Sequence, residues 1–166
     1  MTHWNKPNVP HKGWVCTGME DLGEFVDDGD IEYESCEMCE KEKIRYVHIM
    51  RHNDYGVLRV GCGCAAKMEE DYDNPRTRDD EARKKASRRT NFMKKDWRRN
   101  ENGNYTLRYK GDTITIMKSR YGSGYGVIYK GAPIWDYKGR RNMDLDTAKR
   151  AAFDLFDSRH EVTSTL

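Results

Sequence analysis

The chain has 166 residues, of which 36% are hydrophobic and 35% are charged, and its mean hydropathy is −1.03. So few core-forming residues disfavour one large domain and favour two small modules, one of them stabilised by a metal. No apolar run approaches the ~20 residues of a membrane span, and no signal peptide opens the chain. We therefore expect a cytoplasmic protein without membrane contact, in which thiols stay reduced.

The net charge of +2 conceals two oppositely charged segments. Residues 18–42 contain eleven acidic residues and one lysine, for a net charge of −10. Residues 76–99 contain eleven basic and four acidic residues, for a net charge of +7. The acidic segment is a candidate surface for a protein partner, and the basic segment is a candidate surface for nucleic acid.

The first 35 residues predict little regular structure. Pro7, Pro10 and Gly13 favour an irregular lead-in, followed by a short strand at residues 14–17. Cys16 has no close cysteine partner in the sequence, and we expect it to be a small buried hydrophobic residue. Residues 18–35 are predicted to be an acidic loop that packs on the next module.

The next stretch contains two close cysteine pairs. Cys36 and Cys39 are separated by two residues, which is the spacing of a zinc knuckle, whereas Cys62 and Cys64 are separated by one. Strand-like runs at 44–50 and 57–60 lie between the pairs, joined by the hairpin loop 51–56. Residues 65–70 favour a helix. The sequence thus predicts a knuckle, a hairpin, and a cysteine pair at a helix start.

This order resembles a treble-clef zinc module, although many treble clefs space the second pair by two residues. The segment is also similar to the zinc-knuckle segment of uncharacterised small proteins of bacteria and phages, a resemblance that implies no activity. We expect Cys36, Cys39, Cys62 and Cys64 to bind one Zn²⁺, whose closed coordination sphere makes it structural. Three alternatives are buried or disulfide-bonded cysteines, a site of two cysteines with His48 and His52, and His52 replacing one thiolate.

A polar break with a proline at residues 70–76 suggests two domains, 1–73 and 74–166. A helix is predicted over 77–99, with Thr77 and Asp80 as a capping box. At 100° per residue it has a narrow packing stripe, formed by Ala82, Ala86, Thr90, Met93 and Trp97. The opposite, basic face is a candidate nucleic-acid surface, formed by Lys84, Arg88, Lys95, Arg98 and Arg99.

Beyond this helix the hydrophobic period changes to two. Strands are expected at 105–110 and 113–118, joined by a two-residue turn at Gly111 and Asp112. A third strand at 125–130 and a fourth at 134–137 follow, with basic loops at 120–124 and 138–142. A final helix is predicted from about residue 144 to 157. The fold class is therefore α+β: a small zinc-stapled, treble-clef-like module, then an antiparallel three- or four-stranded sheet with two helices.

Helix, sheet, then helix resembles the double-stranded-RNA-binding domain. The sheet and final helix are also similar to the three-strand-plus-helix DNA-binding domains of plant transcription factors and phage integrases. Both resemblances imply contact with nucleic acid. Aromatic and basic side chains alternate here, as in surfaces that contact bases and phosphates. The candidate residues outside the basic helix are Arg120, Tyr121, Tyr125, Lys138, Arg140 and Arg141.

The resulting functional hypothesis is a zinc-containing nucleic-acid-binding accessory protein from a phage or mobile element, with DNA and RNA both open. The alternative is a protein-binding inhibitor or adaptor of the anti-defence type that uses residues 18–42. We expect no enzymatic activity. His48, His52 and Asn53 suggest a His-Asn-His nuclease, but the following helix lacks the metal-binding histidine that such a site needs.

Overall fold

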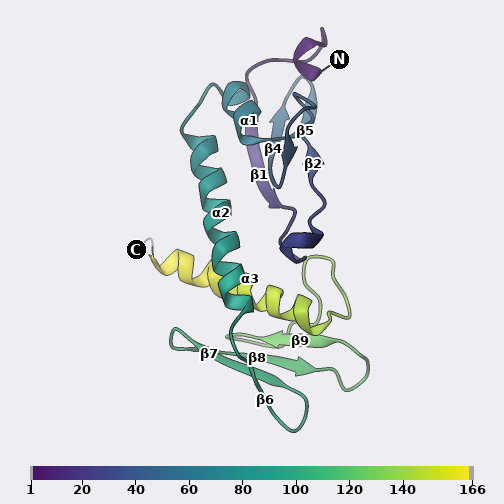
Figure 1. Cartoon of the computed structure of the whole chain (residues 1–166), viewed down its shortest axis with the longest axis vertical. Coiled ribbons are helices and arrows are strands. Elements are labelled where there is room, and N and C mark those ends of the chain that lie inside the picture. The colour runs from purple at the N-terminus through teal and green to yellow at the C-terminus, as the bar shows by residue number, and fades with distance from the viewer. Residues whose placement is uncertain (1, 165–166) are drawn as a thin grey trace. The chain divides into compact units, whose positions relative to one another are not determined.

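The computed structural model describes residues 2–164, with side chains as far as His160. The chain forms two units, residues 1–87 and 88–166, each with its own core. The described part has three α-helices and antiparallel sheets of three, two and four strands, so the predicted α+β class is confirmed (Figure 1). The division between the units falls inside α2 (Asn74–Met93), whereas the predicted boundary lies just before this helix.

Unit 1 is built on a three-stranded sheet in the order β1-β4-β5. The predicted hairpin is present as β4 (Tyr46–His52) and β5 (Gly56–Val60). β1 (Val15–Asp21) is longer than the predicted strand 14–17, because a bulge between Cys16 and Gly18 lets it follow β4 to its start. Two short strands, β2 (Glu34–Ser35) and β3 (Lys43–Ile44), form the second sheet, and α1 spans Cys62–Glu69. Short 3₁₀ helices lie at His3–Asn5 and Asp28–Asp30.

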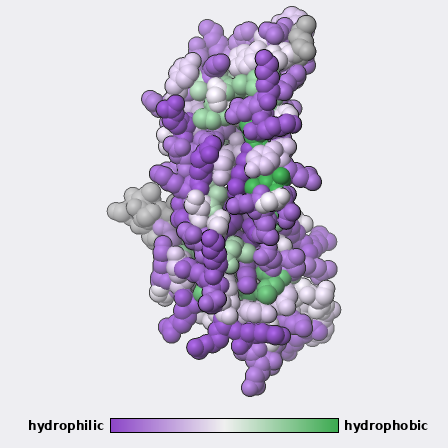
Figure 2. Space-filling model, in the orientation of Figure 1, coloured by the Kyte–Doolittle hydropathy of each residue, from purple (hydrophilic) through white to green (hydrophobic). Residues whose placement is uncertain are grey.

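The core of unit 1 buries one tryptophan, Trp14, and three methionines, Met38, Met50 and Met68, that are among the largest fully buried side chains. His48, Met50, Leu58 and Val60 share one face of the β4–β5 hairpin, because directly opposite residues of antiparallel strands point the same way. His48 is fully buried there. The remaining buried positions are occupied largely by methionine, cysteine, valine and alanine. Figure 2 shows correspondingly that hydrophilic residues dominate the visible surface.

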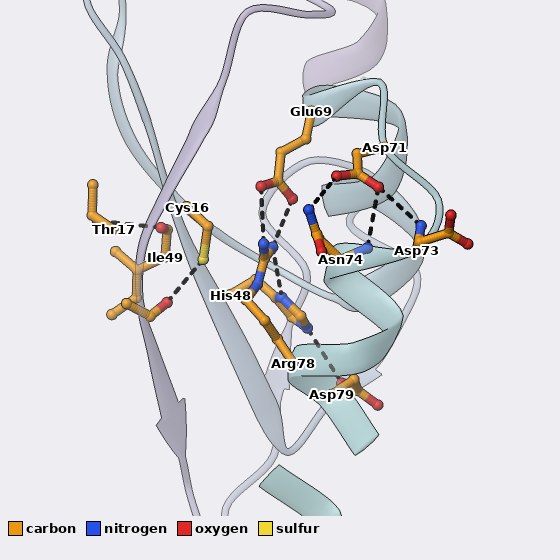
Figure 3. Close-up of polar contacts among 11 residues, drawn as sticks. Cys16, Thr17, His48, Ile49, Glu69, Asp71, Asp73, Asn74, Arg78 and Asp79 are labelled. Atoms are coloured by element: carbon orange, nitrogen blue, oxygen red, sulfur yellow. Dashed lines mark hydrogen bonds and ion pairs between the residues drawn. The ribbon is translucent and has the colours of Figure 1, made fainter. Parts of the chain in front are cut away.

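Both predicted ends of α2 are wrong. The helix begins at Asn74, where the Asp71 carboxylate accepts the N–H groups of Asp73 and Asn74 (3.0 and 3.1 Å), so Thr77 lies inside the first turns (Figure 3). It ends at Met93 rather than residue 99. The chain beyond it pairs with the unit 2 sheet as β6 (Arg98–Arg99), and this pairing overrides local helix propensity.

The packing stripe of α2 also differs from the predicted one, since Trp97 lies beyond the helix end and Thr90 is not part of the stripe. Ala86 is buried and Ala82 is half-buried, as expected, but Thr90 is exposed. Arg89 is buried instead, with its guanidinium 5.5 Å from the ring centre of Phe153. A long cationic side chain can take a core position when its charged end lies over an aromatic face.

Unit 2 has a four-stranded sheet in the order β6-β7-β8-β9. β7 (Tyr105–Tyr109), β8 (Asp112–Lys118) and β9 (Tyr125–Ile128) match the three predicted strands. The turn is Lys110–Gly111 rather than Gly111–Asp112, since both residues have positive φ (49° and 81°), as a type I′ turn requires. The predicted fourth strand is wrong: Ile134 forms only an isolated bridge with Val127, and β6 is the fourth strand, at the opposite edge.

Helix α3 (Leu145–Ser164) covers one face of this sheet and extends beyond the predicted end at 157. Leu107, Ile114, Ile116 and Val127 are buried on that face. The helix contributes alanines, which permit close approach, and aromatic rings that complete the core: Ala148, Ala151, Ala152, Phe153 and Phe156. The side chains that alternate with these strand residues lie on the face away from α3.

Candidate metal centre and nucleic-acid interface

Three of the four predicted zinc ligands meet at one point in unit 1. The sulfur atoms of Cys36, Cys39 and Cys64 all lie within 4.8 Å of one another. Cys36 and Cys39 come from the turn between β2 and β3, and Cys64 comes from the first turn of α1. Bonds of about 2.3 Å to one tetrahedral zinc would place such sulfurs about 3.8 Å apart. The cluster therefore could hold a metal ion.

Hydrogen bonds within the cluster favour the thiolate form of Cys36. The Cys64 thiol, and with it the backbone N–H groups of Cys39, Gly61 and Met38, lower the Cys36 pKa to about 5 against the opposing effect of burial. Cys64 keeps its proton longer, since donating it to Cys36 raises the Cys64 pKa. N–H groups directed at a sulfur also stabilise a metal-bound thiolate.

The turn that carries the knuckle is closed by backbone hydrogen bonds. The Glu40 N–H donates to the Cys36 carbonyl, and the Cys36 N–H donates to the Glu42 carbonyl, both at 2.8 Å. Gly61 is required by the close approach of this segment, because a Cβ there would lie 2.5 Å from Glu42 Oε2. The glycine thus lets the knuckle approach the start of α1.

Cys62 does not join this cluster. It is the first residue of α1 and Cys64 is the third, so at 100° per residue the two side chains point about 200° apart. The Cys62 sulfur lies instead with His48 and Asp79, in a second group whose ligand atoms are within 4.8 Å of one another. Burial first, then the carboxylates of Asp79 and Glu42, raise the Cys62 pKa.

The two histidines weighed as ligands are separated along β4. Four residues of a strand span about 13 Å, so His48 and His52 cannot bind the same ion. The His52 ring packs on Trp14, with its Nδ1 accepting the Asp54 N–H at 3.0 Å. In the described residues, neither histidine belongs to the group of three thiols.

Sequence reasoning missed the role of the N-terminal 3₁₀ helix. The Trp4 side chain donates a hydrogen bond to the Cys64 sulfur. Its neighbour His3 has Nδ1 buried without a hydrogen-bond partner among the described residues, 3.4 Å from Glu40 Oε1. Glu40 directly follows Cys39, so His3 lies beside the knuckle. No local pattern around His3 marks it, because 32 residues separate it from the first cysteine pair.

The five residues of the predicted basic helix face do not lie on one surface of α2. Lys84 is exposed on α2. Arg88 makes a bidentate ion pair with Asp157 (2.7 and 2.9 Å), which neutralises its charge within unit 2. Lys95 follows the helix, with Nζ 4.2 Å from the Tyr109 ring centre. The prediction of a continuous basic helix face is therefore wrong beyond Arg88, because α2 ends at Met93.

Arg98 and Arg99 lie on the edge strand β6 and are exposed. Their side chains point to opposite faces of the sheet, since Arg98 pairs with Thr106 and Arg99 pairs with Tyr105. Arg120 and Tyr121 lie in the loop between β8 and β9, and the Tyr121 side chain is 98% exposed.

The other candidates divide between core and surface. Tyr125 is half-buried and packs edge-on against Tyr105 in the core. Lys138 pairs with Asp154 at 3.0 Å, and the Arg140 guanidinium donates to the Lys138 carbonyl. Arg141 is exposed. Of this set, Tyr125 and Lys138 thus have structural roles.

Some carboxylates of the acidic segment 18–42 form ion pairs with arginines of unit 1. Asp21 receives the Arg45 guanidinium at 2.8 Å, and Glu20 and Glu34 both pair with Arg59 (2.8 and 2.9 Å). The Val26 side chain and the ring of Tyr33 remain exposed. The predicted protein partner at this segment stays a prediction.

Comparison with protein-family models, with curated proteins and with solved structures found no match. None of the described helices combines the length and apolar character needed to cross a membrane.

Proposed function

We propose that this chain is a zinc-containing nucleic-acid-binding protein, in which the metal stabilises unit 1 and the sheet of unit 2 contacts the nucleic acid. The convergence of Cys36, Cys39 and Cys64 supports the metal. Three thiolates favour zinc over hard cations such as Mg²⁺ or Ca²⁺. Bound there, zinc would cross-link the knuckle to α1 across the core of unit 1.

His3 is the best candidate for a fourth ligand. Its buried Nδ1 lacks a hydrogen-bond partner among the described residues, which costs free energy unless something else satisfies it. Its neighbour Trp4 already contacts the Cys64 sulfur, and Glu40, 3.4 Å from the same Nδ1, directly follows Cys39, so the ring lies beside the cluster. This assignment makes a Cys₃His site, a common structural zinc set.

Three single substitutions distinguish the candidates for the fourth ligand. His3→Ala should weaken zinc binding by at least tenfold, whereas His52→Ala should leave it unchanged; Cys62→Ser should leave the cluster's zinc in place. The measurement is competition with a chromophoric zinc chelator. Equal affinity of His3→Ala and wild type would reject His3. Loss of this zinc in Cys62→Ser would restore the predicted four-cysteine site.

The face of the unit 2 sheet away from α3 carries the nucleic-acid proposal. Arg98, Thr106, Thr115 and Ile128 form one row across it, because each pairs with the next in the sheet register. Arg108 pairs with Thr113 in the adjacent row, and both are exposed. Two guanidinium groups among threonines suit contacts with phosphates and base edges.

An apolar groove of about 460 Å³ borders this face. Met117, Tyr121 and Trp135 line it together with Lys118, Ser119 and Arg120. Trp135 lies against the sheet at Gly126, where a Cβ would be 2.7 Å from the indole ring. Exposed aromatic rings next to cations are the groups on which bases stack while phosphates are neutralised.

Fluorescence anisotropy with duplex and single-stranded probes tests this surface. Arg98→Ala/Arg108→Ala should weaken binding and reduce the salt slope by about 1.4–1.8 units if each contacts one phosphate. Trp135→Ala should cost about 1–3 kcal/mol with little change in slope if bases stack on it. Arg76→Ala/Lys84→Ala removes two exposed cations from α2 and is the matched control.

Two results would contradict the proposal. Wild-type affinity no tighter than about millimolar at ~50 mM salt, on both probes, would reject nucleic acid as the ligand. An equal loss of affinity in the α2 control would move the interface from the sheet to the helix.

A further inference from the structure

Unit 1 contains a second group of metal-ligating side chains, separate from the three clustered thiols. It consists of His48 on β4, Cys62 at the start of α1 and Asp79 on α2, whose ligand atoms all lie within 4.8 Å of one another. His48 is fully buried and Asp79 is 9% exposed. Imidazole, thiolate and carboxylate are the three kinds of protein ligand that zinc takes.

The spacing within this group fits two ligands of one metal ion as well as it fits a long hydrogen bond. His48 Nε2 lies 3.3 Å from Asp79 Oδ1, which is long for a buried charge-assisted hydrogen bond (Figure 3). Nitrogen and oxygen ligands at about 2.0–2.1 Å from one tetrahedral ion lie about 3.3 Å apart. The observed separation therefore matches two ligands of one ion.

Neighbouring arginines contact both of these ligands, and one of them, Arg83, orients Asp79 toward the site. Arg83 Nε donates to the other oxygen of Asp79 at 2.9 Å, which leaves Oδ1 directed at His48. Arg78 Nη2 lies 3.4 Å from His48 Nδ1, and its guanidinium is held by Glu69 at 2.6 and 3.0 Å (Figure 3). A group behind a ligand that fixes its orientation, as Arg83 does for Asp79, is a regular feature of metal sites.

One side of the group faces solvent. Cys62 and Asp79 line a cavity of about 340 Å³, together with Glu42, Arg45, Tyr46 and Arg83. His48 is buried behind them. An ion held by all three side chains would therefore have its remaining position toward the cavity, accessible to water or a small anion.

We propose that His48, Cys62 and Asp79 form a second transition-metal site, specific for Zn²⁺ or Co²⁺, with one coordination position open to the cavity. On binding, the ion displaces the Cys62 thiol proton to solvent, whereas the neutral imidazole of His48 keeps its single proton, which passes from Nε2 to Nδ1 by exchange with solvent. The imidazole then carries its proton on Nδ1, so Arg78 turns away from it. The 3.4 Å contact to His48 is the longest of the three that Arg78 makes here, and Glu69 retains the guanidinium. Three protein ligands and one open position distinguish this site from a closed structural one.

Metal analysis of the whole chain at saturating Zn²⁺ tests the stoichiometry. Wild-type protein should bind about two equivalents, and Cys62→Ser or Asp79→Asn about one. Cys16→Ser is the matched control, because the Cys16 thiol belongs to neither group and donates only to the Gly18 carbonyl. The equivalent that remains in the variants reports that the three-thiol cluster, and with it unit 1, is intact.

Cobalt gives a second readout on the wild-type chain. The second Co²⁺ equivalent should add about a third of the sulfur-to-cobalt absorbance of the first, since it gains one thiolate rather than three. Azide should perturb the visible bands of the doubly loaded protein and have no effect on Cys62→Ser.

Three outcomes would overturn the proposal. One is a single equivalent in wild type that Cys62→Ser retains. Another is loss of all metal in Cys62→Ser, which would assign Cys62 to the three-thiol cluster. The third is an azide response that persists in Cys62→Ser, which would place the open position elsewhere.

Discussion

The two units compensate for a shortage of apolar residues in different ways. All five cysteines lie in unit 1, whose core consists largely of small and sulfur-containing side chains around two groups of side chains that could hold a metal ion. Unit 2 has no cysteine, and its core is a cluster of aromatic rings on an alanine-lined helix. The ring of Phe92 contacts four other aromatic rings, those of Trp97, Tyr109, Phe153 and Phe156. One unit thus suits cross-linking by metal, and the other relies on buried aromatic area.

The largest expected effect is the unfolding of unit 1 when its three-thiol cluster is broken. Cys36→Ser should leave unit 1 unfolded, because about 10 kcal/mol or more of metal-binding free energy is lost from folding. Circular dichroism with zinc analysis should detect this, while the near-ultraviolet signal of the unit 2 aromatic cluster persists. Cys16→Ser is the control. A metal-free chain that melts like the zinc-bound one would show that unit 1 does not need the metal.

Truncating the aromatic cluster should instead destabilise unit 2 and leave unit 1 unaffected. Phe92 is 2% exposed, so Phe92→Ala should destabilise unit 2 by about 3–5 kcal/mol through lost burial and a residual cavity. Zinc content should stay at the wild-type value. Tyr121→Ala, at an exposed ring, should leave the denaturation midpoint unchanged. A parallel loss of zinc in Phe92→Ala would contradict the independence of the two cores.

Acidification should have a smaller effect on the stability of unit 2. The Tyr129 hydroxyl at 2.6 Å, with Lys130 at 3.0 Å and His160 at 2.9 Å, holds the pKa of Asp112 well below its usual range. The unfolded carboxyl titrates near pH ~3.9. A lowered folded-state pKa therefore gives stability that is present above this pH and lost as the pH falls below it.

Comparison of Asp112→Asn with wild type between pH 6 and pH 2 measures this contribution. The variant should be less stable at pH 6 and lose less stability on acidification. Identical acid dependence of the two proteins would show that Asp112 does not contribute. Unit 1 should respond differently, since its thiolates release zinc when they are protonated.

Local patterns in the sequence predicted much of the fold. The alternation of residues at 105–118 predicted β7 and β8. The strand-like runs at 44–50 and 57–60, with the loop between them, predicted the β4–β5 hairpin. Both predictions succeeded because hydrophobic period and turn chemistry are short-range properties. The spacing of Cys36 and Cys39 likewise predicted the knuckle. Their sulfurs converge because a tight turn needs only neighbouring residues.

Long-range packing decided the rest. The sequence placed the second cysteine pair at a helix start but predicted the helix only over 65–70. α1 instead includes the pair from Cys62 on, and this start is what turns Cys62 away from Cys64 toward His48 and Asp79. The sequence also did not show that Arg98 and Arg99 leave the helix to pair with β7, or that Asp157 takes the charge of Arg88 from 69 residues away. Each outcome depends on partners distant in the chain, so only the tertiary structure could determine which ligands meet and which cations stay exposed.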